Sequence, residues 1–238
     1  DHPYGHGKFE TLAGLFIGAM LFLIGAKIVV YAVGRFLNPV EPNITVESLL
    51  ILLITLVINI LISSYEYRQG KKLNSSILIS DSMHTRSDIY VTLGVLVTLI
   101  FIRLGFSPII DPITSLVVAA LILHAAYEVI KDNSDVLVDK AVVDREKIRD
   151  IILSFEQVRN AHKIRSRGTL NDLHIDLHLM LDPHISVEES HDLMHKIEDK
   201  LAQELGANVQ MIAHLEPYNQ KNVEYLVQYW KEKRSREL

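Results

Sequence analysis

The apolar positions are distributed unevenly along the chain. Long apolar runs occupy residues 11–130, whereas charged side chains are concentrated in residues 131–238. A membrane-spanning helix needs about 20 consecutive apolar residues to cross roughly 30 Å of hydrocarbon. Four runs reach or approach that length: residues 11–34, 48–64, 77–102 and 108–130. The pattern predicts a polytopic α-helical membrane domain over residues 11–135 and argues against a single soluble domain.

The polar half has the pattern of a small α+β domain over residues 136–217. Apolar residues at helical spacing predict a helix over residues 144–155, and alternation of apolar with polar residues predicts a strand over 172–181. The other predicted elements are a strand at 158–165, a helix from the capping box Ser186–Glu189 to Gly206, and a strand at 208–216. The order αββαβ predicts an open sheet with two helices on one face. Residues 218–238 are predicted to form a charged helical tail.

The positive charges predict the orientation of the spans. Residues 68–72 hold three Lys and Arg side chains between the second and third runs, whereas the other short loops hold few. Cytoplasmic loops are enriched in these residues, so residues 1–10 and the domain after residue 131 are expected in the cytoplasm. The sequence opens at Asp1, without a methionine, on a dense polar motif. We therefore expect it to be the C-terminal portion of a longer chain.

Composition limits the chemistry. The 238 residues include 11 histidines and no cysteine, with a formal net charge of −5. Disulfides and thiolate metal sites are therefore excluded, and any metal ion must be bound by His, Asp, Glu or backbone oxygen. The sequence has a mild negative charge and no basic patch with interleaved aromatic residues, so it gives no reason to expect a nucleic-acid partner.

The third apolar run carries the most informative polar residues. Asp81, His84 and Asp88 share one stripe of the predicted helix, because His84 and Asp88 are about 40° apart at 100° per residue. Ionisable groups at membrane depth cost roughly 2.5–3.5 kcal/mol each, so they usually face a bundle interior or a water-filled path. A His and a carboxylate one turn apart can chelate one divalent cation. The alternative is that Asp81 and His84 belong to the cytoplasmic loop and that Asp88 is a hydrated charge at the helix end.

Two more groups of histidines are candidates for metal binding. Asp1, His2 and His6 lie in a glycine-containing segment that could wrap a cation, although a loop with incidental histidines fits the composition equally well. The predicted cytoplasmic domain holds seven of the 11 histidines, at positions 162, 174, 178, 184, 191, 195 and 214. Any one of them is an ordinary surface or core residue when taken singly. His178 and His214 lie on predicted strands and could converge if these strands are neighbours.

Four motifs resemble those of the cation diffusion facilitators, a family of dimeric, proton-coupled exporters of zinc and other transition metals. They are His-Pro-Tyr-Gly-His-Gly-Lys at residues 2–8, Ser-Asp-Ser-Met-His-Thr-Arg-Ser-Asp at 80–88, Asp-Pro at 111–112 and Ala-His-Leu-Glu-Pro at 213–217. The resemblance covers residues 1–217. It implies six spans, of which the four runs would be the third to sixth and the first two would be absent, and a ferredoxin-like, metallochaperone-like cytoplasmic domain.

The same resemblance implies three metal sites. The transport site would be tetrahedral, with His84 and Asp88 as the pair from one span, and its two partner carboxylates are absent from this sequence. A loop site would use His2 and His6, with Asp1 as a third candidate. The cytoplasmic site would comprise His162, His178, His191, His214 and Glu216. Some relatives have Asp in place of this Glu, whose longer reach changes the geometry of the site.

The function implied by the resemblance is export of divalent metal cations from the cytoplasm across the cell membrane, coupled to inward movement of protons. Zinc is the first choice of metal, with cadmium, iron, manganese and cobalt as alternatives. The cytoplasmic domain would sense metal and join two copies as a homodimer, and membrane lipid would surround the spans. Lys8 would pair with Asp139 as a charge interlock between the membrane part and that domain. Such a chain is a secondary active transporter and not an enzyme.

Two other functions are weighed against export. An intramembrane zinc protease would need His-Glu-x-x-His, but His191 and His195 are separated by Asp192 in place of the Glu and lie in the predicted cytoplasmic helix. A non-transporting, metal-responsive membrane scaffold or receptor would use the cytoplasmic domain as its sensor. It predicts that His84 and Asp88 can be lost without effect.

Overall fold

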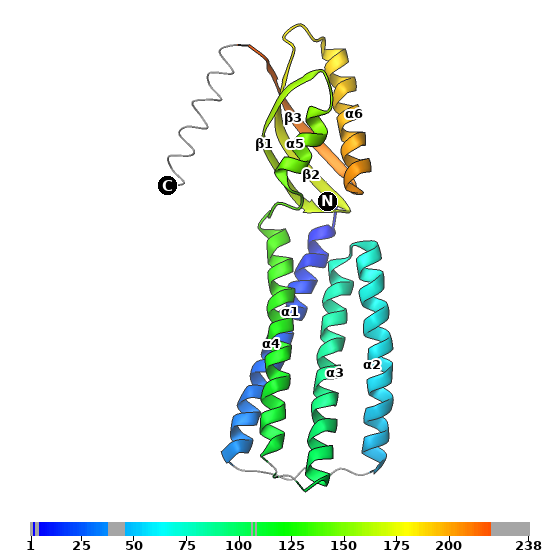
Figure 1. Ribbon diagram of the computed structural model, residues 1–238, viewed down its shortest axis with the longest axis vertical. Helices are drawn as coiled ribbons and strands as arrows, with labels where there is room; N and C mark the ends of the chain where they lie inside the picture. The colour runs from blue at the N-terminus through cyan, green and yellow to red at the C-terminus, as the bar shows by residue number, and fades with distance from the viewer. Residues whose placement is uncertain (1, 3–4, 38–45, 106, 108, 220–238) are drawn as a thin grey trace. The chain divides into compact units, whose positions relative to one another are not determined.

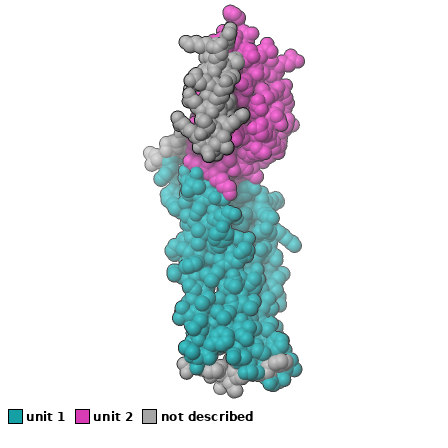
Figure 2. Space-filling view, turned by 60° about the vertical axis from the view of Figure 1, so that its left-hand side comes forward, with its two compact units in different colours: residues 1–138 teal, residues 139–238 magenta. Residues whose placement is uncertain are grey.

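The computed structural model describes residues 2, 5–37, 46–105, 107 and 109–219 of the chain (Figure 1). The chain divides into two compact units, residues 1–138 and residues 139–238 (Figure 2). The described part of the first unit is helical, and the second unit combines helices with a sheet. The predicted helical tail lies, from residue 220 onward, outside the described residues.

Four long helices build the first unit. They are α1 (Gly7–Leu37), α2 (Val46–Leu73), α3 (Ser76–Arg103) and α4 (Ile110–Leu137). All four are long and apolar enough to cross a membrane. Many of their large apolar side chains are exposed, among them Phe16 at 67% and Val30 at 73%. Such a surface suits hydrocarbon as its solvent, and the predicted polytopic helical domain is confirmed.

The second helix extends beyond its apolar run. The basic segment at residues 68–72 was expected in a loop, but it forms the last turns of α2, and the connection to α3 is only residues 74–75. Arg, Gln and Lys are good helix formers, and the helix continues through the one poor former of the segment, Gly70, at a cost of about 1 kcal/mol. An apolar run therefore marks the part of a helix that fits hydrocarbon and does not mark where the helix stops.

Helix α1 packs closely on α4 through its glycines. A Cβ atom added at Gly14 would lie 2.3 Å from Oδ1 of Asn133, and one added at Gly18 would lie 2.7 Å from Cγ1 of Ile130. The missing side chains of Gly14 and Gly18 therefore allow the two helices to approach closely. The Asn133 side chain is almost fully buried and donates from Nδ2 to Oγ of Ser80 at 3.1 Å, which ties α4 to α3.

The second unit has the predicted order αββαβ. Its elements are α5 (Arg145–Leu153), β1 (Val158–Thr169), β2 (Asp172–Leu181), α6 (Val187–Leu205) and β3 (Val209–Pro217). The sheet order is β1-β2-β3, in which β1 and β2 are antiparallel and β2 and β3 are parallel. Helix α6 is the crossover between the two parallel strands. The predicted small α+β domain is confirmed.

Alternation along β2 decides which side chains enter the core. Leu173, Leu177 and Leu179 are fully or almost fully buried and pack with apolar residues of α5 and α6. Ile175 belongs to the same core, so both helices cover one face of the sheet, while the polar residues that alternate with these, such as Asp176 and His178, point to the other face. Ser186 and Glu189 form the predicted capping box of α6, and Gly206 ends that helix with a φ of 61°.

Candidate metal centres

The stripe on α3 lies within the helix. Asp81 and His84 are in the early turns of α3, so neither belongs to a loop. Both are partly buried, whereas Asp88, one turn further on, is exposed on the surface of the described spans. The Nδ1 atom of His84 is buried and has no hydrogen-bond partner among the described residues. The pair is therefore spaced for chelation, and the described spans bring no third ligand to it.

One acidic residue beside this stripe was missed in the sequence. Glu66 of α2 accepts a hydrogen bond from Oγ1 of Thr85 at 3.2 Å, and it lies close enough to Asp81 and His84 for their charges to interact. It follows the second apolar run and so resembles a charge at a helix end. A signal was present, however. Because α2 and α3 are joined by only residues 74–75, Glu66, eight positions before that turn, lies near residues at similar distances after it.

The N-terminal segment brings two predicted ligands together. The rings of His2 and His6 have their centroids 4.8 Å apart. The N–H of Gly5 donates to the carbonyl of His2 at 2.9 Å, and Gly5 has a φ of 80°. Both rings also contact the ring of Phe9. Asp1, the third candidate, lies outside the described residues.

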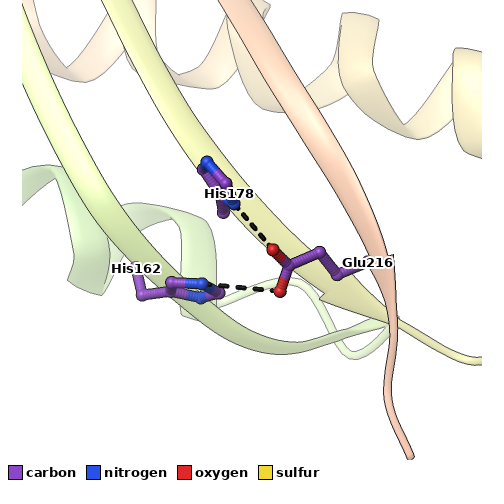
Figure 3. Close-up of side chains that lie close together, drawn as sticks. All are labelled: His162, His178 and Glu216. Carbon is purple, nitrogen blue, oxygen red and sulfur yellow. Dashed lines mark hydrogen bonds and ion pairs between the residues drawn. The ribbon is translucent and has the colours of Figure 1, made fainter. Parts of the chain in front are cut away.

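The most complete group of ligands lies on the sheet of the second unit. One ligand atom from each of His162, His178 and Glu216 lies within 4.8 Å of the others (Figure 3). Oε1 of Glu216 is 2.7 Å from Nδ1 of His178, and its Oε2 is 3.5 Å from Nε2 of His162. The carboxylate therefore lies between the two imidazoles. Among the described residues this is the only group of three or more such side chains with ligand atoms so close together.

Strand register explains why these residues meet. His162 is opposite His178 in the β1–β2 pair, and His178 is opposite His214 in the β2–β3 pair. The three histidines form one row across the sheet, with the rings of His178 and His214 at 4.7 Å. Glu216 is two residues beyond His214, so it shares its face. The predicted meeting of His178 with His214 is confirmed.

The position of His162 depends on an irregularity in β1. Two residues separate His162 from Arg165, but only one separates their partners His178 and Asp176 on β2. The extra residue forms a β-bulge, and Lys163 has a φ of 51° there. A bulge of this kind keeps the strand on both sides of it in phase with its neighbour. Both His162 and Arg165 therefore stay on the same face of the sheet as their partners.

The chemistry of the group suits a divalent cation. His162 is 5% exposed, and neither of its ring nitrogens has a hydrogen-bond partner among the described residues. A buried polar group left unpaired costs about 1–3 kcal/mol, which a bound metal ion would offset. Burial lowers the pKa of His162, against the opposing effect of the Glu216 carboxylate. The imidazole is therefore held neutral, which is the form that binds a metal ion.

Three other predicted residues are not members of this group of three. His191 is on α6, where its Nε2 atom lies 3.1 Å from Nε2 of His195. Lys8 is in the first turn of α1, within the first unit, and Asp139 begins the second unit. The participation of His191 in the sheet site and the pairing of Lys8 with Asp139 stay predictions.

Comparison with known proteins adds independent information on both units. The family described as the cation efflux transmembrane domain matches residues 1–138, and the cation efflux protein cytoplasmic domain matches residues 142–218. A manganese efflux system protein of Bacillus subtilis is 30% identical over 227 residues, covering 92% of this chain and 76% of that protein.

Two further relatives have similar coverage. An uncharacterized transporter of Methanocaldococcus jannaschii is 33% identical over 205 residues, covering 84% of this chain and 71% of that protein. A cadmium, cobalt and zinc/H(+)-K(+) antiporter of Bacillus subtilis is 28% identical over 230 residues, covering 93% of this chain and 72% of that protein. The similarity in each case extends across most of the chain and therefore includes both units.

Proposed function

The chain belongs to the cation efflux family, and on that premise we propose that it exports divalent transition-metal ions, with zinc as the first choice, from the cytoplasm across the cell membrane in exchange for protons. It is a multi-pass membrane protein whose C-terminal domain is cytoplasmic. The exported metal ion is the substrate, so the transport step needs a site that both binds and releases it.

One observation carries this proposal: α3, a helix apolar enough to span a membrane, bears His84 and Asp88 one turn apart. Burying ionisable groups at membrane depth is costly, so their presence there points to a use. Nδ1 of His84 is buried and bonds to none of the described residues, so no hydrogen bond from them competes with a ligand for that atom. Imidazole and carboxylate are both common ligands of divalent zinc. The stripe therefore supplies half of a four-ligand transport site, and the resemblance assigns the other half to two carboxylates of another span.

Proton coupling follows from the chemistry of these ligands. The imidazole of His84 and the carboxyl group of Asp88 must both be unprotonated to bind a cation, so cation and proton compete for the same atoms. If the site faces one side of the membrane and then the other, protonation on the outer side releases the metal ion. Each proton is then carried inward on the side chain that bound the metal.

The choice of zinc rests on the ligand types. A mixed set of imidazole and carboxylates suits a tetrahedral zinc ion, whereas a set of oxygen ligands alone would favour manganese or magnesium. One relative is named for manganese and another for cadmium, cobalt and zinc. Cadmium, iron, manganese and cobalt therefore remain the alternatives, to be separated by competition in a transport assay.

We assign the sheet group a regulatory role. His162, His178 and Glu216, with His214 beside them, would bind cytoplasmic metal and so favour whichever state of a homodimer binds it more tightly. A site of this kind reports the cytoplasmic metal concentration without carrying the transported ion. His2 and His6 would form an additional loop site, and a pairing of Lys8 with Asp139 would tie the membrane part to the cytoplasmic domain.

The test is metal flux into proteoliposomes that contain the complete chain. His84→Ala and Asp88→Ala should each reduce zinc flux to the background of empty liposomes, because each removes one ligand of the proposed transport-site pair. His124→Ala is the matched control, since it removes an exposed imidazole from another span, α4. Wild-type flux in either stripe variant would overturn the proposal.

One observation favours the second candidate, a metal-responsive scaffold or receptor. Among the described residues, the closely spaced three-ligand group lies in the cytoplasmic unit and not in the spans. On this alternative, the loss of His84 and Asp88 would have no effect on signalling by the domain. Metal binding by the sheet group without any zinc flux from the wild-type chain would establish it.

A further inference from the structure

Two positive side chains meet one aromatic ring where α2 and α3 pack together. The guanidinium carbon of Arg86, on α3, lies 4.5 Å from the centre of the Tyr67 ring, on α2, and Nζ of Lys71 lies 4.6 Å from the same centre. A cation within about 6 Å of the centre of an aromatic face is attracted to it. Tyr67 therefore holds two positive charges close together, on two helices that are long and apolar enough to cross a membrane.

No carboxylate of the described residues balances these two charges. The other side-chain contact of Arg86 is with Sδ of Met83 at 3.7 Å, and neither Arg86 nor Lys71 forms an ion pair with a described residue. Arg86 is partly buried within a candidate span. Ionisable side chains inside a span usually pair with an opposite charge, a backbone carbonyl or water. A ring and a thioether are weaker partners, so the two cations favour an anion beside them.

These charges lie toward the cytoplasmic surface of the membrane. Helix α4 leads into the cytoplasmic domain, and α3 runs in the opposite direction, so α3 begins on the cytoplasmic side (Figure 1). Lys71 is in the last turn of α2, next to that beginning, and the exposed Arg68 and Lys72 add two more charges there. Anionic lipids make the cytoplasmic leaflet negative. The anions at hand are therefore phospholipid headgroups.

The surface beyond the two cations suits the acyl chains of a lipid. Ile60 is seven residues before Tyr67 on α2, and Leu93 is seven residues after Arg86 on α3. Seven residues make about two helical turns, so each apolar residue lies on the same side of its helix, further from the cytoplasmic end. Ile60 is 45% exposed and Leu93 is 44% exposed. A headgroup beside the cations would thus have exposed apolar side chains for its acyl chains.

We propose that Tyr67, Lys71 and Arg86 form a binding site for the headgroup of an anionic phospholipid such as phosphatidylglycerol. Its phosphodiester accepts hydrogen bonds from Arg86 and Lys71, and its acyl chains lie along α2 and α3. At 100° per residue Arg86 points about 160° away from His84, so the lipid does not occupy the α3 stripe. The inference therefore does not rest on the proposed export function.

The experiment counts the lipids that stay with the full chain. The protein is purified in micelles that contain equal amounts of phosphatidylglycerol and phosphatidylcholine, and it is washed at about 1 M salt, where the Debye length of about 3 Å removes diffuse attraction. The wild type should retain one phosphatidylglycerol more per chain than Arg86→Gln or Lys71→Gln. Arg68→Gln and Lys72→Gln are the matched controls, because each removes an exposed cation of the same segment, and both should retain lipid as the wild type does.

A photoreactive acyl chain on phosphatidylglycerol locates the bound lipid. Crosslinks should fall within residues 60–71 and 86–93 in the wild type and should be lost in Lys71→Gln, whose exposed position makes a folding defect the smaller risk. Equal lipid retention in Lys71→Gln and Lys72→Gln would overturn the proposal. Displacement of the lipid by excess inorganic phosphate would also overturn it, since the site would then take a soluble anion. Neither measurement uses metal or flux, so failure here is distinct from failure of the export function.

Discussion

The two regions that carry candidate ligands, the stripe on α3 and the group on the sheet, assemble them in different ways. Neighbouring strands are about 4.8 Å apart, so residues in register across three strands meet without help from any other element. A single helix offers about one residue per turn on each face, so α3 places Asp81, His84 and Asp88 in one line along its axis and cannot surround an ion with them. The sheet holds its ligands together within one domain. The helix leaves coordination to be completed elsewhere, which suits a site that must let its ion go.

Of the changes that test this difference between the sheet group and the α3 stripe, Glu216→Gln is expected to have the largest effect. The change removes the carboxylate that lies between His162 and His178, so zinc affinity of the sheet group should fall by roughly a hundredfold. Even the loss of a residue that only hydrogen-bonds to a metal ligand typically weakens metal binding by about 10–100-fold. Equilibrium dialysis of the full chain measures the affinity, and proteoliposome flux at saturating zinc should be retained.

Asp176→Asn is the control for this change, because it neutralises a carboxylate on the same face of β2 and leaves the group of three intact. It should bind zinc as the wild type does. If Glu216→Gln abolished flux as completely as His84→Ala, the two regions would not be separate sites, and the comparison would fail.

A smaller effect is expected at Glu66, which lies beside the α3 stripe. Glu66→Gln removes a negative charge that interacts with His84 and should raise the half-saturating zinc concentration for flux by roughly threefold to tenfold. The maximal rate should change little, because His84 and Asp88 remain. Flux measured over a range of zinc concentrations separates the two quantities.

Glu47→Gln serves as the comparison for that variant, since Glu47 is an exposed carboxylate in the first turn of the same helix. It should leave the half-saturating concentration unchanged. An equal shift in both variants would mean that Glu66 acts through overall charge and not through its place beside the stripe.

The smallest effect is a pH dependence of stability in the sheet domain. Burial lowers the pKa of His162 from its ordinary value of 6.5, so the unfolded chain takes up a proton more readily than the folded one. Stability should therefore be unaffected by this group above pH 6.5 and should fall as the pH drops below it. Hydrogen exchange of β2 amides in metal-free protein, corrected for intrinsic rates, reports the change.

His162→Leu should flatten that dependence, because it replaces the buried imidazole with an apolar side chain. His184→Ala, which removes an exposed imidazole, should not. Identical pH profiles for the wild type and His162→Leu would show that other histidines dominate the acid sensitivity of this domain.

The fold was largely predictable, because periodicity reports burial directly. The apolar runs predicted four spans, and alternation along residues 172–181 predicted β2 with the observed bounds. The end of α2 was not predictable from the apolar run, since its basic segment is both polar and helix-forming. The prediction of a loop at residues 68–72 was wrong because the end of the apolar run was taken as the end of the helix. The end of that run marks only where the helix leaves the hydrocarbon.

The sites were predictable only where ligands share one element or a simple register. His84 and Asp88 could be grouped from their spacing on one helix. His178 and His214 could be grouped from the expected pairing of two strands. The position of Glu66 beside the stripe could be predicted only by knowing that just two residues separate α2 from α3. The contact of His191 with His195 was predictable as an i, i+4 spacing on the predicted helix.

The extra residue at Lys163 has a consequence for comparing this domain with its relatives. Side chains alternate strictly along a regular strand, so two residues three positions apart, such as His162 and Arg165, would point to opposite faces without the extra residue between them. A related chain with a regular strand here would keep the same pairing with one residue fewer between these two positions. When homologous domains are aligned, a one-residue gap at this position is therefore compatible with an intact row of histidines across the sheet.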